Sequence, residues 1–277
     1  MTGSYRKIAA MNMPDVRAGG ADMPEPKFER AKPADLLVDE TYQRNLSERS
    51  VRLIRKIVAH WDWRTFMPPV VVKTPAGLHV IDGQHTAIAA ASHPKITSIP
   101  VMIVAAEDIR DRAKAFLGRN RDRIAVTPNQ LFAAAVAAGD DDAVTIHQVC
   151  DRAGIRILKQ PPGAGLFKPG DTLAVSTIGA LVNRRGAMRA RQILQLVGEA
   201  KLAPVPAAII KAADEIMFGA EFAGQVEAAD LTTAIRASLG EAESEAKIFA
   251  ATHGVPFWKA MTSVLFKRCK RGRKRAP

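Results

Sequence analysis

Cysteine and long apolar runs are both scarce in this chain of 277 residues. The two cysteines, Cys150 and Cys269, lie far apart in unrelated contexts, which excludes a disulfide scaffold and a cysteine-based zinc site. No stretch approaches the roughly 18 apolar residues of a membrane span, and residues 1–10 are polar and basic, unlike a secretory signal. The sequence therefore predicts a cytoplasmic protein that is neither secreted by a standard signal nor inserted in a membrane.

Aromatic and acidic residues are also few. Aromatic residues make up 5% of the chain, and Trp61, Trp63 and Trp258 are scattered, which disfavours a stacking platform for single-stranded nucleic acid. Asp and Glu total 28 against 40 Lys and Arg, so the formal net charge is +12 and the pI is near 10.0. This balance favours an anionic partner.

Much of the positive charge lies at the end of the chain. Residues 267–277 hold seven Lys and Arg and no acid, which leaves +5 for all the residues before them. Such a run is typical of a solvated basic tail, which either keeps the protein soluble or neutralises DNA phosphates. The residues expected to contact phosphate here are Lys267, Arg268, Lys270, Arg271, Arg273, Lys274 and Arg275.

The first half of the chain predicts a small α/β domain over residues 33–125, after a flexible lead-in over 1–32 that lacks periodicity. Ser47 is placed to cap a helix, and the runs PPVVVK and LHVI predict a hairpin. A further strand is expected over residues 99–104, followed by a helix that ends at Gly118. The inward-facing residues of this helix are expected to be Ile109, Ala113, Phe116 and Leu117.

The second half, residues 126–266, predicts an all-helical region, so the fold class is α+β. Thr127-Pro128-Asn129-Gln130 is a capping box, and the two helices separated by Gly139 have the lengths of a helix-turn-helix. The runs VSTIGALVNRRG and AMRARQILQLVGEA predict another pair of helices. From Pro206 onward the pattern is helical, with Asp230 expected as a helix cap. Four arginines with no acid between them are expected to contact DNA phosphates, namely Arg184, Arg185, Arg189 and Arg191.

The turn from Asp82 to Thr86, with the sequence DGQHT, is the most informative short motif. It follows the second hairpin strand and precedes a helical composition, QHTAIAAA. A glycine at such a turn permits close approach of a ligand, and the free amides at a helix N-terminus favour a phosphate. The same turn also occurs where nothing is bound, so on physical grounds both interpretations stay open.

Three motifs occur in a fixed order: YQR at Tyr42–Arg44, IDGQHTAIAA, and RNRDRIAVTPNQL. In this order the chain resembles the ParB/sulfiredoxin-like superfamily, over roughly residues 33–155, and in particular its phage and plasmid members with a DGQHR motif. The last motif is similar to the ENxQRxxLxPxExA stretch of ParB proteins, which Asn120, Arg123 and Pro128 match. Val126 stands in the place of Leu, and Gln130 in the place of Glu.

The resemblance implies a fold that binds a nucleotide triphosphate, CTP or ATP with Mg²⁺, and a DNA-bound homodimer in the bacterial nucleoid or in phage. The implied nucleotide-binding residues are Gly83, Gln84, His85, Thr86, Asn120 and Arg123. Three positions depart from the family. Thr86 replaces the arginine of DGQHR, Arg119 stands where ParB has the glutamate associated with hydrolysis, and Gln84 replaces the sulfiredoxin cysteine. The last change excludes sulfinic-acid reduction.

The sequence thus favours a nucleotide-responsive DNA-binding protein that acts in plasmid or phage DNA partition or regulation, rather than an enzyme. Two alternatives remain. The first is a metal-dependent nuclease that uses Asp82 and His85 as catalytic residues, with His79 or Asp122 as a further ligand; a weak nucleotide triphosphatase is the other enzymatic reading. The second alternative is a degenerate domain that serves as a protein-interaction module.

Overall fold

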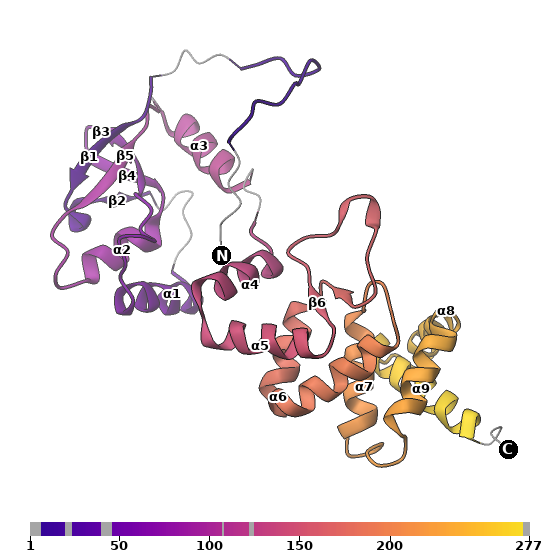
Figure 1. Ribbon diagram of the computed structural model, residues 1–277. Coiled ribbons are helices and arrows are strands. Elements are labelled where there is room, and N and C mark those ends of the chain that lie inside the picture. Colours follow the sequence, from indigo (N-terminus) through magenta and orange to yellow (C-terminus); the bar gives the residue numbers. More distant parts are fainter. Residues whose placement is uncertain (1–6, 20–23, 40–45, 107, 122–124, 274–277) are drawn as a thin grey trace. The chain divides into compact units, whose positions relative to one another are not determined.

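The computed structural model describes residues 7–19, 24–39, 46–106, 108–121 and 125–273. The chain divides into two compact units, residues 1–124 and 125–277 (Figure 1). The first is a mixed α/β unit and the second is mainly helical, as the sequence predicts. Within the described residues, no helix is long and apolar enough to span a membrane.

The first unit is built on a five-stranded mixed sheet with the order β1-β5-β3-β4-β2. Strands β3 and β4 form the predicted antiparallel hairpin, β5 runs parallel to β3, and β1 pairs antiparallel with β5 at one edge. Strand β2 pairs parallel with β4 at the other edge. The strands are β1 Lys27–Ala31, β2 Leu37–Val38, β3 Val70–Thr74, β4 Gly77–Asp82 and β5 Ile99–Ile103.

Three α-helices and a short 3₁₀-helix complete this unit: η1 Pro33–Asp35, α1 Glu48–Ala59, α2 Gln84–Ser92 and α3 Ile109–Arg121. Helix α2 packs its alanines Ala87 and Ala90 against Val71, Val80 and Val101 of the sheet. Helix α1 packs on α2, and α3 contacts β4. The end of β4 and the start of α2 therefore lie where α3 can reach them.

Three details of this unit differ from the expectations. Strand β1 lies within residues 1–32, which were predicted as a flexible lead-in. The sequence did not indicate this strand because KFERA carries a single large apolar residue, Phe28, which stays exposed. Helix α3 continues through Gly118 to Arg121 rather than ending there. Ile109 and Leu117, both expected to face inward, are exposed.

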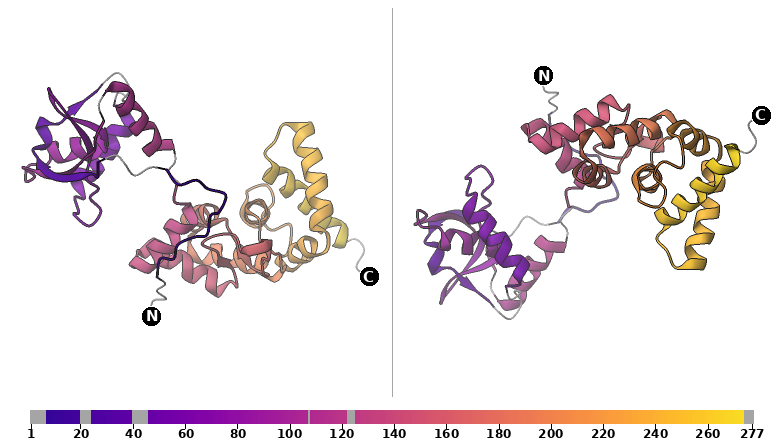
Figure 2. Two further views of the ribbon diagram at one scale, coloured as in Figure 1. Left: turned by 90° about the horizontal axis from the view of Figure 1, so that it is seen from above. Right: turned by 90° about the horizontal axis from the view of Figure 1, so that it is seen from below.

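The second unit comprises six helices within the described residues, together with a small parallel sheet of β6 and β7 and a 3₁₀ turn. Their bounds are α4 Pro128–Ala138, α5 Asp141–Arg152, β6 Arg156–Ile157, η2 Gly163–Gly165, β7 Asp171–Thr172, α6 Val175–Glu199, α7 Ala207–Phe218, α8 Ala228–His253 and α9 Phe257–Arg273. One large core joins α5 through α9. Helices α8 and α9 pack side by side (Figure 2).

The predicted local signals at the start of this unit are confirmed. The Thr127 hydroxyl accepts the Gln130 amide, while the Gln130 side chain accepts the Thr127 amide, which is the capping box. Gly139 ends α4 in the left-handed conformation, and Asp140 caps α5. Helix α6 breaks at Gly186, with φ 73° and ψ 164°, so its two halves match the predicted pair of helices.

Two expectations for this unit are wrong. Asp230 lies in the first turn of α8, whereas Glu227 occupies the N-cap position. The segment predicted as a solvated tail is helical from Lys267 to Arg273, as part of α9, because apolar residues such as Leu265 and Cys269 anchor this helix in the core. Residues 274–277 lie outside the described residues.

Candidate functional site

The Gly83 turn joins β4 to α2 and forms the centre of the candidate site. Gly83 has φ 87° and ψ 20°, a left-handed conformation that favours glycine. A Cβ at this position would lie 3.0 Å from Cα of Pro69, which is tighter than ordinary contact. Both the backbone conformation and the close approach of Pro69 therefore require glycine here.

The turn presents free backbone donors. The Gly83 amide donates to Oδ1 of Asp82 at 2.8 Å, and the Ala87 amide donates to the Gly83 carbonyl at 3.0 Å, which closes the first turn of α2. The amides of Gln84, His85 and Thr86 lie before that first helical bond, so they have no acceptor within the helix. Together with the positive end of the helix dipole, they suit an anion such as a phosphate.

The side chains of Gln84, His85 and Thr86 surround these amides. All three are half-buried, and none forms a hydrogen bond or ion pair within the described residues. They are consequently available to a ligand. Thr86 offers one hydroxyl where an arginine would offer a bidentate fork, so the backbone amides supply most of the donors.

Arg119 lies beside the turn. Its Nε is 3.6 Å from Oδ2 of Asp82, and both side chains are roughly one-third exposed. The pair brings a positive charge from α3 to the start of α2. Asn120 lies in α3, but its side chain is outside the described part of the structure, and so are Arg123 and Asp122.

A cavity of about 270 Å³ opens on one side of Thr86. Its apolar wall comes from the second half of α1 and the segment after it, namely Leu53, Ile57, Trp61 and Phe66. Lys56, His60, Asp62 and Thr65 supply the polar rim. The indole Nε1 of Trp61 is buried and lacks a hydrogen-bond partner in the described residues. The cavity therefore combines a flat apolar wall, an unpaired donor and a cation near the Gly83 turn.

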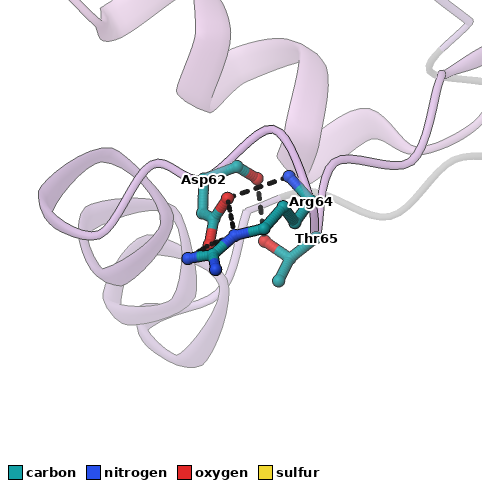
Figure 3. Close-up of polar contacts among 3 residues, drawn as sticks. All are labelled: Asp62, Arg64 and Thr65. Carbon is teal, nitrogen blue, oxygen red and sulfur yellow. Dashed lines mark hydrogen bonds and ion pairs between the residues drawn. The ribbon is translucent and has the colours of Figure 1, made fainter.

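The turn after α1 holds this wall in place (Figure 3). The carboxylate of Asp62 accepts the Arg64 amide at 2.9 Å and pairs with the Arg64 guanidinium at 2.7 Å. The Thr65 hydroxyl donates to the Asp62 carbonyl at 3.0 Å. The hydrogen bonds from the Arg64 side chain and amide hold the pKa of the Asp62 carboxyl below its usual value. These contacts close the turn between Trp61 and Phe66, whose ring centroids lie 5.6 Å apart.

Asp82, His85 and His79, the residues expected to serve a metal-dependent nuclease, do not form a metal-binding cluster in the described residues. There, no group of three or more His, Cys, Asp or Glu side chains is placed to hold a metal ion. Asp82 is engaged with the Gly83 amide and Arg119. His79 lies within β4, and both of its ring nitrogens are buried without a partner.

In the second unit, two of the four predicted DNA-binding arginines form ion pairs with a buried acid. Asp214 on α7 is 2% exposed, and it pairs with both Arg184 and Arg185. The Arg189 guanidinium lies 5.4 Å from the Phe218 ring centroid, and Arg191 is exposed. Asp214 could have been suspected from the sequence, since it stands four residues after Ile210 on the apolar face of α7.

The basic residues of α9 are partly engaged as well. Arg268 pairs with Glu241 and Glu245 of α8 at 3.1 Å. Lys267 and Lys270 are exposed, with their ammonium groups 5.5 Å and 4.8 Å from the ring centroids of Phe249 and Phe266. Arg271 and Arg273 belong to α9, but their side chains are outside the described part, as are Lys274 and Arg275.

Helices α4 and α5 form the pair expected as a helix-turn-helix, and α5 packs on α6. Helix α5 exposes three acids, Asp141, Asp142 and Asp151, which would repel DNA phosphates. By contrast, the first half of α6 exposes Ser176, Asn183 and Arg184 and carries no acid. Among these helices, α6 therefore has the surface better suited to DNA.

Comparisons with known proteins find remote similarity to solved structures. No family model matches the chain, and no curated protein matches its sequence. Among solved structures, it is similar to the C-terminally truncated chromosome-partitioning protein ParB from Caulobacter crescentus complexed with CTP-gamma-S. That similarity has 13% identity and a TM-score of 0.39, and covers 68% of this chain and 98% of the ParB chain. A likeness this remote does not assign a function.

Proposed function

We propose that the chain is a ParB-like DNA-binding protein whose α/β unit binds a nucleotide triphosphate at the Gly83 turn. The observation that carries this proposal is the set of amides at Gln84, His85 and Thr86 that have no acceptor within α2. Beside them lie half-buried side chains that make no hydrogen bond or ion pair with the described residues. A triphosphate is the ligand that such donors at a helix N-terminus suit, and the motif order of the sequence resembles nucleotide-binding ParB proteins.

The residues around the turn have complementary roles in this proposal. The amides hold phosphate oxygens, and the His85 and Thr86 side chains add donors. The cavity beside Thr86, with Trp61 and Lys56, has room for a further part of the ligand. By the resemblance, Asn120 and Arg123 complete the site and bind nucleotide or Mg²⁺. Magnesium would neutralise phosphate charge there.

The helical unit supplies the DNA contact in this proposal. The exposed face of α6 and the lysines of α9 neutralise backbone phosphates, which gives salt-dependent affinity with little sequence readout. Nucleotide binding at the first unit biases the segment that leads from α3 to α4, and so regulates how the helices engage DNA. Partition or regulation of plasmid or phage DNA is the role that fits these two activities.

The decisive test is nucleotide binding by a Gln84→Glu variant. Labelled CTP and ATP are titrated with Mg²⁺ into the full-length protein. The substitution keeps the shape of the side chain and places a negative charge at the start of α2, where it is favourable for the helix but repels phosphate. We expect saturable binding by the unchanged protein and a loss of about tenfold or more in the variant, from roughly 1.4 kcal/mol of repulsion.

Gln148→Glu, the same change on an exposed face of α5, is the matched control and should bind as the unchanged protein does. If neither CTP nor ATP binds the unchanged protein, the nucleotide proposal is wrong. Equal binding by both variants would place the nucleotide elsewhere. Nicking of supercoiled plasmid with Mg²⁺ or Mn²⁺, abolished by Asp82→Ala, would instead support the nuclease.

A further inference from the structure

We propose that a cavity between α6, α7 and α9 is a binding site for a phosphate group, supplied either by the DNA backbone or by a free phosphate. The cavity has a volume of about 290 Å³. Its polar lining comes from Thr177 and Arg184 of α6 and from Lys211, Asp214 and Glu215 of α7, and Trp258 of α9 forms a flat wall. The site lies entirely within the helical unit.

Asp214 holds Arg184 in place before any ligand arrives. Oδ2 of Asp214 accepts from Nη2 of Arg184, and Oδ1 accepts from Nε of Arg185 at 2.8 Å. The carboxylate is buried, whereas the Arg184 side chain is 55% exposed. A guanidinium carries five N–H donors, so Arg184 keeps donors to offer toward the cavity. Fixing it against a buried acid removes much of the ordering entropy that phosphate binding would otherwise require.

The charges around the cavity favour an anion. Asp214 balances one of its two arginines, so this triad retains one positive charge. Lys211 makes no ion pair in the described residues and adds a second. The Thr177 hydroxyl likewise has no hydrogen-bond partner there, so it can donate to a phosphate oxygen.

Glu215 is the opposing charge. Its carboxylate lies against the backbone of Gly219, close to where a Cβ of that residue would stand. Glu215 and Trp258 also line a neighbouring cavity of about 240 Å³. Glu215 therefore belongs to the boundary between the two cavities, and its removal should strengthen phosphate binding. This expected gain distinguishes a ligand site from a purely structural ion-pair cluster.

The position of the site relates it to DNA. Arg184 stands two residues before the break at Gly186, and the exposed Arg189 and Arg191 follow on the same helix. A backbone phosphate in the cavity would fix the register of α6 on the duplex. Binding of a DNA phosphate at this site rests on the proposed function, whereas binding of free phosphate does not.

The test follows the indole N–H resonance of Trp258 in nitrogen-15-labelled full-length protein, assigned with Trp258→Phe. Inorganic phosphate and a short DNA duplex are titrated separately at constant ionic strength. We expect both to shift the Trp258 resonance. Lys211→Ala should weaken phosphate binding about tenfold because a charged hydrogen bond is lost. Glu215→Gln should strengthen phosphate binding about threefold because a repelling negative charge is removed. Lys247→Ala, an equal loss of charge on an exposed site of α8, is the control.

Each outcome bears on the proposal. If neither probe shifts the Trp258 resonance, the site is wrong. If DNA binds but Lys211→Ala and Glu215→Gln have the same DNA affinity as Lys247→Ala, the proposed phosphate site is wrong, although the protein still binds DNA. If phosphate binds with the expected variant pattern and DNA does not, the site is supported and the proposed DNA function fails. Unchanged circular dichroism of each variant shows that the fold is retained.

Discussion

Arg119 on α3 lies with its Nε 3.6 Å from Oδ2 of Asp82, at the end of β4. The other oxygen of Asp82 accepts the Gly83 amide at 2.8 Å. The Asp82 carboxylate therefore contacts both the Gly83 turn and helix α3. Its negative charge also stands beside the amides that we propose bind nucleotide.

The Asp82→Asn variant distinguishes the nucleotide-binding interpretation of this site from the nuclease interpretation. The amide side chain can still accept the Gly83 hydrogen bond, but it no longer repels phosphate or neutralises Arg119. We expect CTP or ATP to bind about fivefold more tightly, as removal of about 1 kcal/mol of repulsion predicts. Anisotropy of a labelled nucleotide measures the change. Weaker nucleotide binding would contradict this role of Asp82, and loss of a metal-dependent nicking activity would favour the nuclease.

The local structures that were predicted correctly are those formed by residues close together in sequence. The Gly83 turn follows from a glycine between a strand and a helical composition, and the capping box at Thr127 needs residues only three positions apart. A short window of sequence contains all the groups that form such features. Gly139 as the end of α4 is another example.

The parts that were missed depend on residues distant in sequence. The sequence shows no acid near Arg184 and Arg185, so their pairing with Asp214, about thirty residues further on, was not foreseen. Residues 267–273, the last part of α9, were predicted as a tail because basic side chains dominate their composition. Their contacts with Glu241 and Phe249 of α8 form only after the two helices pack. Strand β1 is defined by its pairing with β5 rather than by its own apolar pattern.

Asp171 predicts a pH dependence of stability in the helical unit. Burial raises the pKa of this carboxyl, but hydrogen bonds from the Lys168 amide and the Arg156 side chain outweigh burial, so the net pKa is lowered. A lowered folded-state pKa stabilises the protein above the unfolded value of about 3.9, and this contribution is lost as the pH falls through the folded-state pKa.

The corresponding variant is Asp171→Asn. We expect it to lower the free energy of unfolding at pH 7 by about 2 kcal/mol, since a buried charged hydrogen bond is lost. The difference from the unchanged protein should shrink below about pH 4. Urea unfolding followed by circular dichroism at several pH values measures both. Asp151→Asn, at an exposed pair with His147, should have little effect. A difference that does not depend on pH would rule out the charge as the cause.

Cys150 is predicted to be unreactive in the folded protein. Burial, with a smaller contribution from Asp151, raises the pKa of its thiol to about 12. At pH 8 only about one thiol in ten thousand is then ionised, and the thiolate is the reactive form. Cys269 is buried as well. A chromogenic disulfide reagent should therefore label neither thiol in buffer and both in urea. Rapid labelling of the native protein would show that the helical core opens.

The exposed and the neutralised arginines of the helical unit should differ in their contribution to DNA binding. Arg191 is exposed on α6, whereas Arg268 is paired with Glu241 and Glu245. A cation that displaces a counterion from DNA adds about one to the slope of log affinity against log salt, but a cation already paired within the protein adds little. Arg191→Gln should therefore reduce that slope by about one and weaken binding at low salt. Arg268→Gln should leave the slope unchanged even if it lowers stability. Fluorescence anisotropy of a labelled duplex over a salt series measures both variants, and an equal loss of slope in the two would mean that Arg268 leaves its glutamates to meet DNA.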